Sequence, residues 1–156
     1  MTSIETHIII QAPIEEVTSI FFNYQSYQEW NPFLVKFQKY TNKSDPTLNV
    51  GDELQIDLKL KGMSHTSTMY PKVLQSSDTI LEWKGDLLYD WIFHGFHKFE
   101  FKSIDNNKRT VVSQSEKFGG ILVYVFKILG LYRKTQESFI EFNEALKDQV
   151  EKSINK

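Results

Sequence analysis

The chain has 156 residues, 40% of them hydrophobic and 14% aromatic, which is enough apolar material for one domain with a sizeable core but not for two. Its formal net charge of -2, from 18 basic and 20 acidic residues without a long run of either, gives no electrostatic reason to expect nucleic acid or an anionic membrane. The absence of cysteine excludes disulfides and thiolate chemistry. We therefore expect a single domain over residues 1–156.

The amino-terminal segment "MTSIETHIII" lacks the basic flank, apolar run and cleavage site of a signal peptide, so we expect a cytoplasmic protein. The most apolar stretch runs from Ile121 to Tyr132, but Lys127 interrupts it, and it is shorter than the roughly 20 residues that span a bilayer. We expect it to be buried or to lie on another surface. The expected protein is a monomer or homodimer without a nucleic-acid partner or a stable membrane association.

The first third of the chain predicts a strand followed by two short helices. Residues 4–11 form the predicted strand, and Pro13 then stands where a first-turn proline, followed by acidic residues, favours a helix start. The stretch "NYQSYQEW" suggests a second short helix, which ends where Pro32 pushes Asn31 out of the helical region. Residues 34–40 predict another strand, and a polar loop rich in turn formers follows it.

The middle of the chain alternates apolar and polar residues with the two-residue period of half-buried antiparallel strands. In "ELQIDLKLK", residues 53–61, the leucine and isoleucine side chains fall on one face and the charged or amide side chains on the other. Further strands are predicted at 64–74, 79–85, 96–105 and 109–118.

The final segment predicts one long amphipathic helix that opens at "GGILVYVF". Phe139, Phe142, Leu146 and Val150 recur at spacings of three and four residues. Gly130 interrupts this helix and costs on the order of 1 kcal/mol against alanine, so one interpretation is a kink or hinge with a mobile first half. An unbroken packed helix is the other interpretation.

This order of elements is that of an α+β fold in which a curved sheet wraps a helix. Five segments in sequence support it: "APIEEV" at 12–17, "YQEWNPF" at 27–33, "LEWKGDLL" at 81–88, "HKFEF" at 97–101 and "TVVSQSEKFGGIL" at 110–122. Together they resemble the START-like, or SRPBCC, superfamily, and within it the polyketide cyclase/dehydrase-like group of small bacterial proteins. The resemblance covers essentially the whole chain. It implies a helix-grip (START-like) fold, a curved antiparallel sheet around a long carboxy-terminal helix with two short helices after the first strand.

The resemblance also implies a deep cavity between sheet and helix. The aromatic residues support a cavity, because they cluster in strands and before Phe96. The core of a domain of this size holds a limited number of rings, so we expect some of them to line a pocket. A dry, filled core is the alternative. For Trp30 two roles are expected as alternatives: it lines the mouth of the pocket, or it anchors a short helix. For residues 86–93 the alternatives are a lid, a dimer contact or a segment that packs against the final helix. The expected ligand-contact residues are Trp30, Phe33, Trp83, Trp91, His97, Phe99, Phe101, Gln114 and Glu116.

Two histidines, His94 and His97, lie three residues apart. On a helix they would share a face, but on a strand such positions point to opposite faces. The alternation over 96–105 indicates a strand with His97 on its apolar face, so we expect no zinc site here. His7 and His65 are isolated in the sequence, and no metal or other cofactor is expected.

The stretch "SIDNNKRT" predicts a two-residue hairpin turn at Asn106 and Asn107, which tolerate positive φ. In that register His97 faces Glu116, with Gln114 nearby. A carboxylate beside an imidazole suits general acid/base work or recognition of a ligand oxygen. Alternatively, the two buried groups simply satisfy each other. We favour ligand orientation or structural satisfaction over catalysis, since no nucleophile is indicated.

Three functions remain as hypotheses, because the superfamily includes lipid carriers, hormone receptors, aromatic cyclases, allergens and chaperone activators. The leading one is binding of a small hydrophobic molecule, such as a lipid, polyketide or aromatic metabolite. The alternative is a cyclase/dehydratase-type enzyme with His97 and Glu116 as its acid/base pair. A co-chaperone role like that of the chaperone ATPase activators is third, and the charge pattern gives no sign of the exposed interaction surface it needs.

Overall fold

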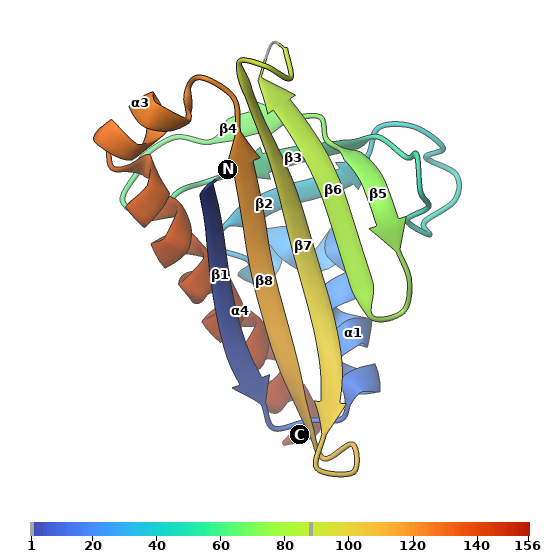
Figure 1. The fold of residues 1–156 in the computed structure, drawn as a ribbon. Helices are drawn as coiled ribbons and strands as arrows, with labels where there is room; N and C mark the ends of the chain where they lie inside the picture. The colour runs from blue at the N-terminus through green and yellow to red at the C-terminus, as the bar shows by residue number, and fades with distance from the viewer. Residues whose placement is uncertain (1, 88) are drawn as a thin grey trace.

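The computed structural model describes residues 2–87 and 89–156, and it confirms the expected α+β, helix-grip fold. A strand opens the chain, short helices follow it, and a long helix at the end packs on the sheet that this first strand forms with later strands (Figure 1). The strands are β1 (Thr2–Ile10), β2 (Leu34–Lys39), β3 (Leu54–Leu58), β4 (Ser67–Met69), β5 (Lys72–Ser76), β6 (Ile80–Leu87), β7 (Phe93–Ile104) and β8 (Arg109–Gly119). The helices are α1 (Ile14–Phe22), the 3₁₀ turn η1 (Tyr24–Ser26), α2 (Tyr27–Trp30), α3 (Val123–Ile128) and α4 (Leu131–Ile154).

The strands form two antiparallel sheets, in the orders β1-β8-β7-β6-β5 and β2-β3-β4. The prediction of one strand over 64–74 is wrong, because the chain passes from one sheet to the other between β4 and β5. Pro71 lies at this junction and has no N–H to donate to a ladder. Its carbonyl accepts a hydrogen bond from the Leu54 N–H (2.9 Å), and the Val73 N–H donates to Asp52 (2.9 Å), so the backbones of the two sheets stay joined there.

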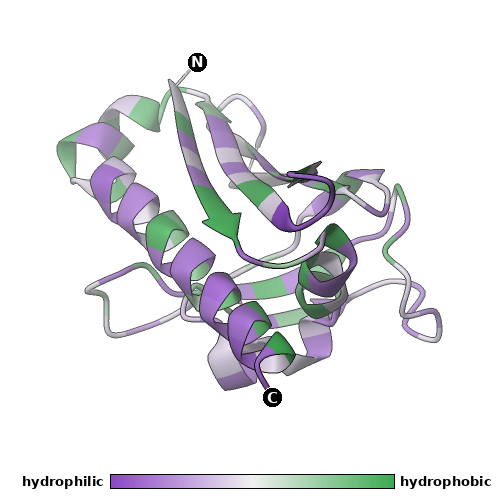
Figure 2. Cartoon of the chain, turned by 90° about the horizontal axis from the view of Figure 1, so that it is seen from below, coloured by the Kyte–Doolittle hydropathy of each residue, from purple (hydrophilic) through white to green (hydrophobic). Residues whose placement is uncertain are grey.

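Helix α4 lies against β1 and β8 and also contacts α1. Figure 2 shows it crossing beside the sheet, with hydrophobic positions interspersed among hydrophilic ones. Phe139, Phe142, Leu146 and Val150 are fully buried, as their spacing predicts. Burying each such side chain contributes about 1.5 to 3 kcal/mol, so this stripe holds the helix on the sheet.

The predicted single helix at the end of the chain is divided into α3 and α4. Gly130 lies at the break with a φ of 73°, in the left-handed region that glycine adopts without steric cost. Of the two interpretations of this glycine, the kink is therefore confirmed and the unbroken helix is wrong. Within the described part of the chain, no helix combines the length and apolarity needed to cross a membrane.

The hairpin between β7 and β8 follows the predicted register. Asn106 and Asn107 have positive φ values of 54° and 62°, as the tight turn requires. The pairing brings His97 directly opposite Glu116. Strand β7 begins at Phe93, three residues earlier than predicted, so it includes both histidines of the aromatic run.

The same turn caps helix α1. Asn107 Oδ1 accepts a hydrogen bond from the Ile14 N–H (3.0 Å), and its Nδ2 donates to the Glu15 carboxylate (2.9 Å). This second bond lowers the pKa of Glu15 below its ordinary value. Because the N-cap residue of α1 is Pro13, the helix has no capping side chain of its own, and the hairpin supplies the missing acceptor from across the fold.

Candidate ligand-binding site

His97 lies in the middle of β7, on the apolar face of the sheet, and is only 3% exposed. Its ring centroid is 4.7 Å from that of Trp83 on β6 and 4.7 Å from that of Phe99, and both pairs are nearly parallel. Phe139 of α4 lies 4.8 Å away, and Phe33 lies 6.2 Å away. Rings from the strands, from α4 and from the segment before β2 therefore enclose the imidazole.

Both ring nitrogens of His97 face oxygen atoms. Nε2 lies 3.0 Å from Oε1 of Gln114, and Nδ1 lies 3.3 Å from Oε2 of Glu116. The predicted side-by-side placement of His97, Gln114 and Glu116 is therefore confirmed. Their shared role at a ligand site stays a prediction.

The direction of these hydrogen bonds follows from a chain of partners that ends at a backbone carbonyl. The Thr6 hydroxyl donates to the carbonyl of Gln114 (3.3 Å), so its oxygen is free to accept from Nδ2 of Asn143 (2.9 Å). Oδ1 of Asn143 then accepts from Nε2 of Gln114 (2.9 Å), which turns Oε1 of Gln114 toward His97. Since an amide oxygen only accepts, Nε2 of His97 carries the hydrogen.

This assignment determines what the His97–Glu116 contact requires. With Nε2 protonated, Nδ1 of a neutral imidazole would turn a lone pair toward the carboxylate. The contact is favourable when both ring nitrogens are protonated, or when the Glu116 carboxyl donates to Nδ1. An imidazole and a carboxylate this close, 3.3 Å apart, have the spacing over which a proton can pass between them, as general acid/base chemistry requires.

The buried network reaches the surface at Glu116. The Glu116 side chain is 15% exposed, against 4% for the His97 side chain. Gly95, two residues before His97 on β7, leaves room for the carboxylate, because a Cβ at that position would lie 2.5 Å from Oε1 of Glu116. Glu116 is thus the member of the network that solvent or a ligand oxygen can meet.

The space between the sheet and α4 is filled by side chains around His97. Around His97 the described side chains pack as in the filled core that the sequence left open as an alternative. The rings of Trp83, Phe99 and Phe142 contact one another with centroids 5.3 to 5.6 Å apart along the series. The predicted ligand-contact residues that share this region, all at most 5% exposed, are Phe33, Trp83, His97, Phe99, Phe101 and Gln114.

Two predicted tryptophans lie elsewhere. Trp30 is half-buried, with its ring 6.0 Å from Phe142 of α4, and its Nε1 donates to the hydroxyl of Ser26 (3.3 Å), so it anchors α2 against α4. Trp91 is 62% exposed in the turn before β7 and stacks only on Tyr89, at 6.5 Å. The fold does not bring Trp91 to His97, because it lies at the tip of the β6–β7 hairpin.

The segment 86–93, interpreted as a lid, a dimer contact or a packing segment, comprises the end of β6, a turn and the start of β7. Leu88 lies outside the described residues. The carbonyls of Trp91 and Ile92 accept hydrogen bonds of 3.1 and 3.0 Å from the backbone that enters α3. The turn and α3 are therefore joined at one end of the molecule (Figure 1).

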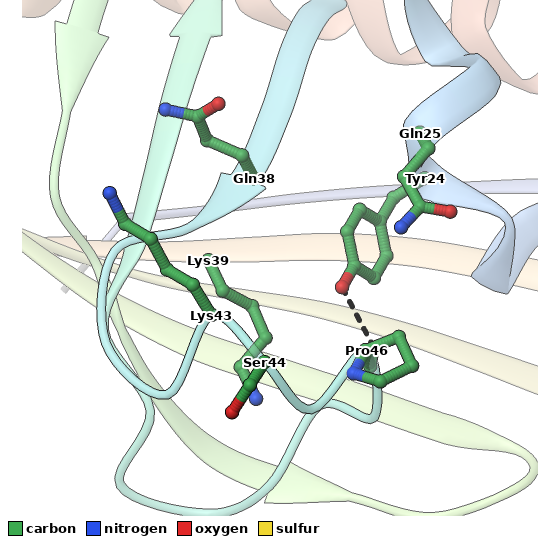
Figure 3. A pocket seen from close by; sticks show the side chains of 7 residues that line it. All are labelled: Tyr24, Gln25, Gln38, Lys39, Lys43, Ser44 and Pro46. Carbon is green, nitrogen blue, oxygen red and sulfur yellow. Dashed lines mark hydrogen bonds between the residues drawn. The ribbon is translucent and has the colours of Figure 1, made fainter.

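The surface pockets described here lie away from His97. One of about 460 Å³, drawn in Figure 3, lies between η1 and the β2–β3 connection, where the Tyr24 hydroxyl donates to the carbonyl of Pro46 (2.8 Å). A neighbouring pocket of about 730 Å³ is bordered by Phe22 and Leu48 together with mainly polar residues. Neither is lined by His97 or by the rings that enclose it.

The two histidines of the aromatic run lie on opposite faces of β7, as strand geometry predicts. Nδ1 of His94 donates to the carbonyl of Asp90 (2.7 Å), outside the core. Across residues 2–87 and 89–156, no three His, Cys, Asp or Glu side chains come together as a possible metal site.

Three polar residues in the interior were not predicted from the sequence. Thr6 and Asn143 complete the network behind Gln114, and the signal for Asn143 was a polar residue within the apolar stripe of α4. Asn31 is 5% exposed, and its Oδ1 accepts from the N–H groups of Phe33 and Leu34. Its Nδ2 is the one buried side-chain nitrogen or oxygen without a partner in the described part of the chain.

We compared the chain with known protein families, sequences and structures. No family model and no curated protein sequence matches the chain. Its structure is similar to that of the Zhui aromatase/cyclase from Streptomyces sp. R1128, with a TM-score of 0.75 and 11% identity over 98% of this chain and 95% of that one. The di-domain ARO/CYC BexL from the BE-7585A biosynthetic pathway gives a TM-score of 0.68 and 14% identity, over 96% of this chain and 50% of BexL.

A START superfamily protein from Mycobacterium smegmatis also matches, with a TM-score of 0.65 and 16% identity over 96% of this chain and 97% of that one. The chain therefore has the START-like helix-grip fold that its sequence motifs suggested. At these identities the likeness establishes the fold alone, and the activity must be argued from the residues around His97.

Proposed function

We propose that the protein binds a small hydrophobic molecule, such as a lipid, polyketide or aromatic metabolite, between the sheet and α4. The observation that carries the proposal is a histidine buried among four aromatic rings, with a carboxylate 3.3 Å from its Nδ1 that reaches solvent. Rings provide apolar contact area, and one polar group among them orients a ligand by its oxygen. The structural likeness to an aromatase/cyclase and to a START superfamily protein supports this class of ligand.

Ligand entry requires the rings around His97 to move apart, since they fill the site in this conformation. A ligand hydroxyl or carbonyl would then meet Glu116 or the Nδ1 side of the imidazole, where the network is open. The Nε2 side is held by Gln114 and Asn143. His97 is therefore pre-oriented by the helix and presents one edge to the ligand.

A cyclase/dehydratase-type reaction is the second candidate function, because the Glu116 carboxylate lies beside the imidazole of His97, at 3.3 Å from Nδ1. The His97–Glu116 pair could withdraw a proton from an enolisable substrate and return it to a leaving hydroxyl. Binding is the better-supported function. The rings and the polar groups around His97 are sufficient to hold and orient a ligand, whereas a reaction also requires a substrate with a reacting group, and none is identified.

The test uses two matched probes, naphthalene and 1-naphthol, which differ by one hydroxyl. We expect saturable binding of both, with quenching of the buried Trp83, and a preference for 1-naphthol. His97→Phe keeps a ring in the site but should reduce that preference about tenfold, because the hydroxyl then loses its partner. Native mass spectrometry of the purified protein should also detect a co-purifying apolar molecule.

The absence of saturable binding for both probes, with no apolar molecule released on extraction, would contradict the binding proposal. An unchanged preference in His97→Phe would remove His97 from the ligand contact while leaving apolar binding in place. If a substrate is found, retention of binding with loss of turnover by orders of magnitude in the same variant would favour the enzyme.

A further inference from the structure

Helix α3 and the turn before β7 expose apolar side chains at one end of the molecule. Phe126 of α3 packs on Phe93 and Phe118, with ring centroids 5.5 and 4.9 Å apart, whereas Tyr124 and Ile128 of the same helix are 74% and 83% exposed. The α3 patch, as we name this surface, consists of side chains that are 47 to 83% exposed: Tyr89, Trp91, Ile121, Tyr124, Val125, Ile128 and Leu129.

The two segments of the patch are joined through their backbones. The backbone entering α3 is hydrogen-bonded to the carbonyls of Trp91 and Ile92, so the turn and the helix are held side by side. A groove of about 150 Å³ beside the helix is lined only by apolar side chains: Phe93, Leu122, Val125, Phe126, Leu129 and Leu131. Exposed apolar surfaces of this kind mark interaction sites in soluble proteins.

The charge around the patch is positive, in contrast to the chain as a whole. From residue 117 to residue 136 there are four basic residues and no acidic one, which gives +4 within a chain of net charge -2. The adjoining hairpin adds Asp86 and Asp90, both paired with Lys84, and so carries a net charge of -1, which leaves +3 for the two segments together. The basic residues are Lys117, Lys127, Arg133, which pairs with Glu137, and Lys134.

We infer that the α3 patch docks onto the surface of an anionic phospholipid bilayer. A short helix with apolar residues on its outer side and basic residues beside it can lie in the interface, and Trp and Tyr rings are favoured at the headgroup level. A second copy of the chain fits less well, because a two-fold contact centred on α3 would place Lys127 of one copy near Lys127 of the other. The inference does not rest on the proposed ligand-binding function.

Local charge explains why whole-chain composition gave no reason to expect such an interaction. The attraction of a basic segment to anionic lipid falls off within a Debye length, so only the charge close to the bilayer counts. The docking is peripheral and reversible, because α3 is six residues long and cannot span the membrane.

The experiment is co-sedimentation of the full chain with vesicles of phosphatidylcholine, with and without phosphatidylserine. We expect binding to the anionic vesicles and a loss of about tenfold or more in Ile128→Glu, since Ile128 is 83% exposed and its replacement puts a charge against the lipid. Val50→Glu is the matched control. Val50 is 67% exposed in the β2–β3 connection, and this variant should bind like the unmodified protein.

Fluorescence provides the second readout, because Trp91 is 62% exposed while Trp83 is 2% exposed. Brominated lipids should quench the emission of Trp91, and Trp91→Phe should abolish most of that quenching. Equal binding of Ile128→Glu and Val50→Glu, or no binding to anionic vesicles, would overturn the inference. A dimer in solution that Ile128→Glu converts to monomer, without vesicle binding, would assign the α3 patch to a second copy.

Discussion

At the scale of single residues, the direction of each hydrogen bond behind His97 is determined by its neighbour. The Gln114 amide links the imidazole to Asn143 of α4, and both of its polar ends are used. A buried network of this kind stabilises the fold only when every member is satisfied. Removing one amide therefore affects two partners at once.

We predict that Gln114→Leu, which keeps a similar volume, lowers the free energy of unfolding by about 3 kcal/mol, because it leaves polar atoms of His97 and Asn143 without partners. The double variant with Asn143→Leu should lose clearly less than the sum of the two single variants, since one orphaned partner is removed with it. Urea unfolding measures both. Additive losses would show that the two amides do not act together.

At the scale of elements, a buried ion pair holds the long connection between β2 and β3. Nζ of Lys39 lies 2.9 Å from Asp52, and the two side chains are 3% and 2% exposed. The same nitrogen donates to the carbonyls of Asp45 and Thr47, both at 2.8 Å. The pair is fully hydrogen-bonded, which is the condition under which a buried charge is tolerated.

Burial alone would raise the pKa of Asp52, but its hydrogen bonds from Lys39, the Asn49 N–H and Asn42, with the charge of Lys39, outweigh that effect and lower it. A lowered pKa stabilises the fold above the ordinary carboxyl value of about 3.9, and this contribution is lost as the pH falls through the folded-state value.

We predict that Asp52→Asn costs about 3 kcal/mol at neutral pH, because it leaves Lys39 buried without a counter-charge. The difference from the unmodified protein should shrink as the pH falls below about 4, because the carboxyl of the unfolded chain takes up its proton there before the buried one does. Urea unfolding from pH 7 to about pH 3 tests this. The exposed Asp78→Asn serves as control, and a difference that stays constant with pH would refute the explanation.

At the scale of the whole molecule, the fold joins a firmly packed part to a lightly packed end. Helix α4 is held by a fully buried stripe and by a network that reaches Thr6, 137 residues from Asn143 in the chain. Helix α3 buries mainly Val123 and one side of Phe126, and Gly130 separates it from α4. The end that carries the α3 patch is thus less firmly packed than the part of the molecule that holds α4.

We predict that backbone amides of α3 exchange hydrogen for deuterium at least about a hundredfold faster than those at 139–150 of α4, because local opening there exposes little apolar surface. Hydrogen exchange measured by mass spectrometry resolves the two segments. Binding of anionic vesicles should slow exchange in α3 selectively. Equal protection of both helices in the free protein would contradict the division.

The sequence by itself determined the strands of the middle region apart from the one predicted at 64–74, the turn at Asn106 and Asn107, and through it the pairing of His97 with Glu116. These follow from local rules, because side chains alternate along a strand and a tight turn sets the register. The apolar stripe of α4 also follows from a local rule, because residues three and four apart share one face of a helix. Motif order then indicated the helix-grip fold, which the structure confirms.

Only the tertiary structure decided the rest. It divided the strand at Pro71, because residues far apart in sequence offered partners in two different sheets. It placed Trp91 at a solvent-exposed tip, filled the space around His97 with rings, and joined Thr6, Gln114 and Asn143. These outcomes depend on which elements pack against each other. The periodicity of the sequence shows which face of a helix or strand is apolar, but not which other element covers that face.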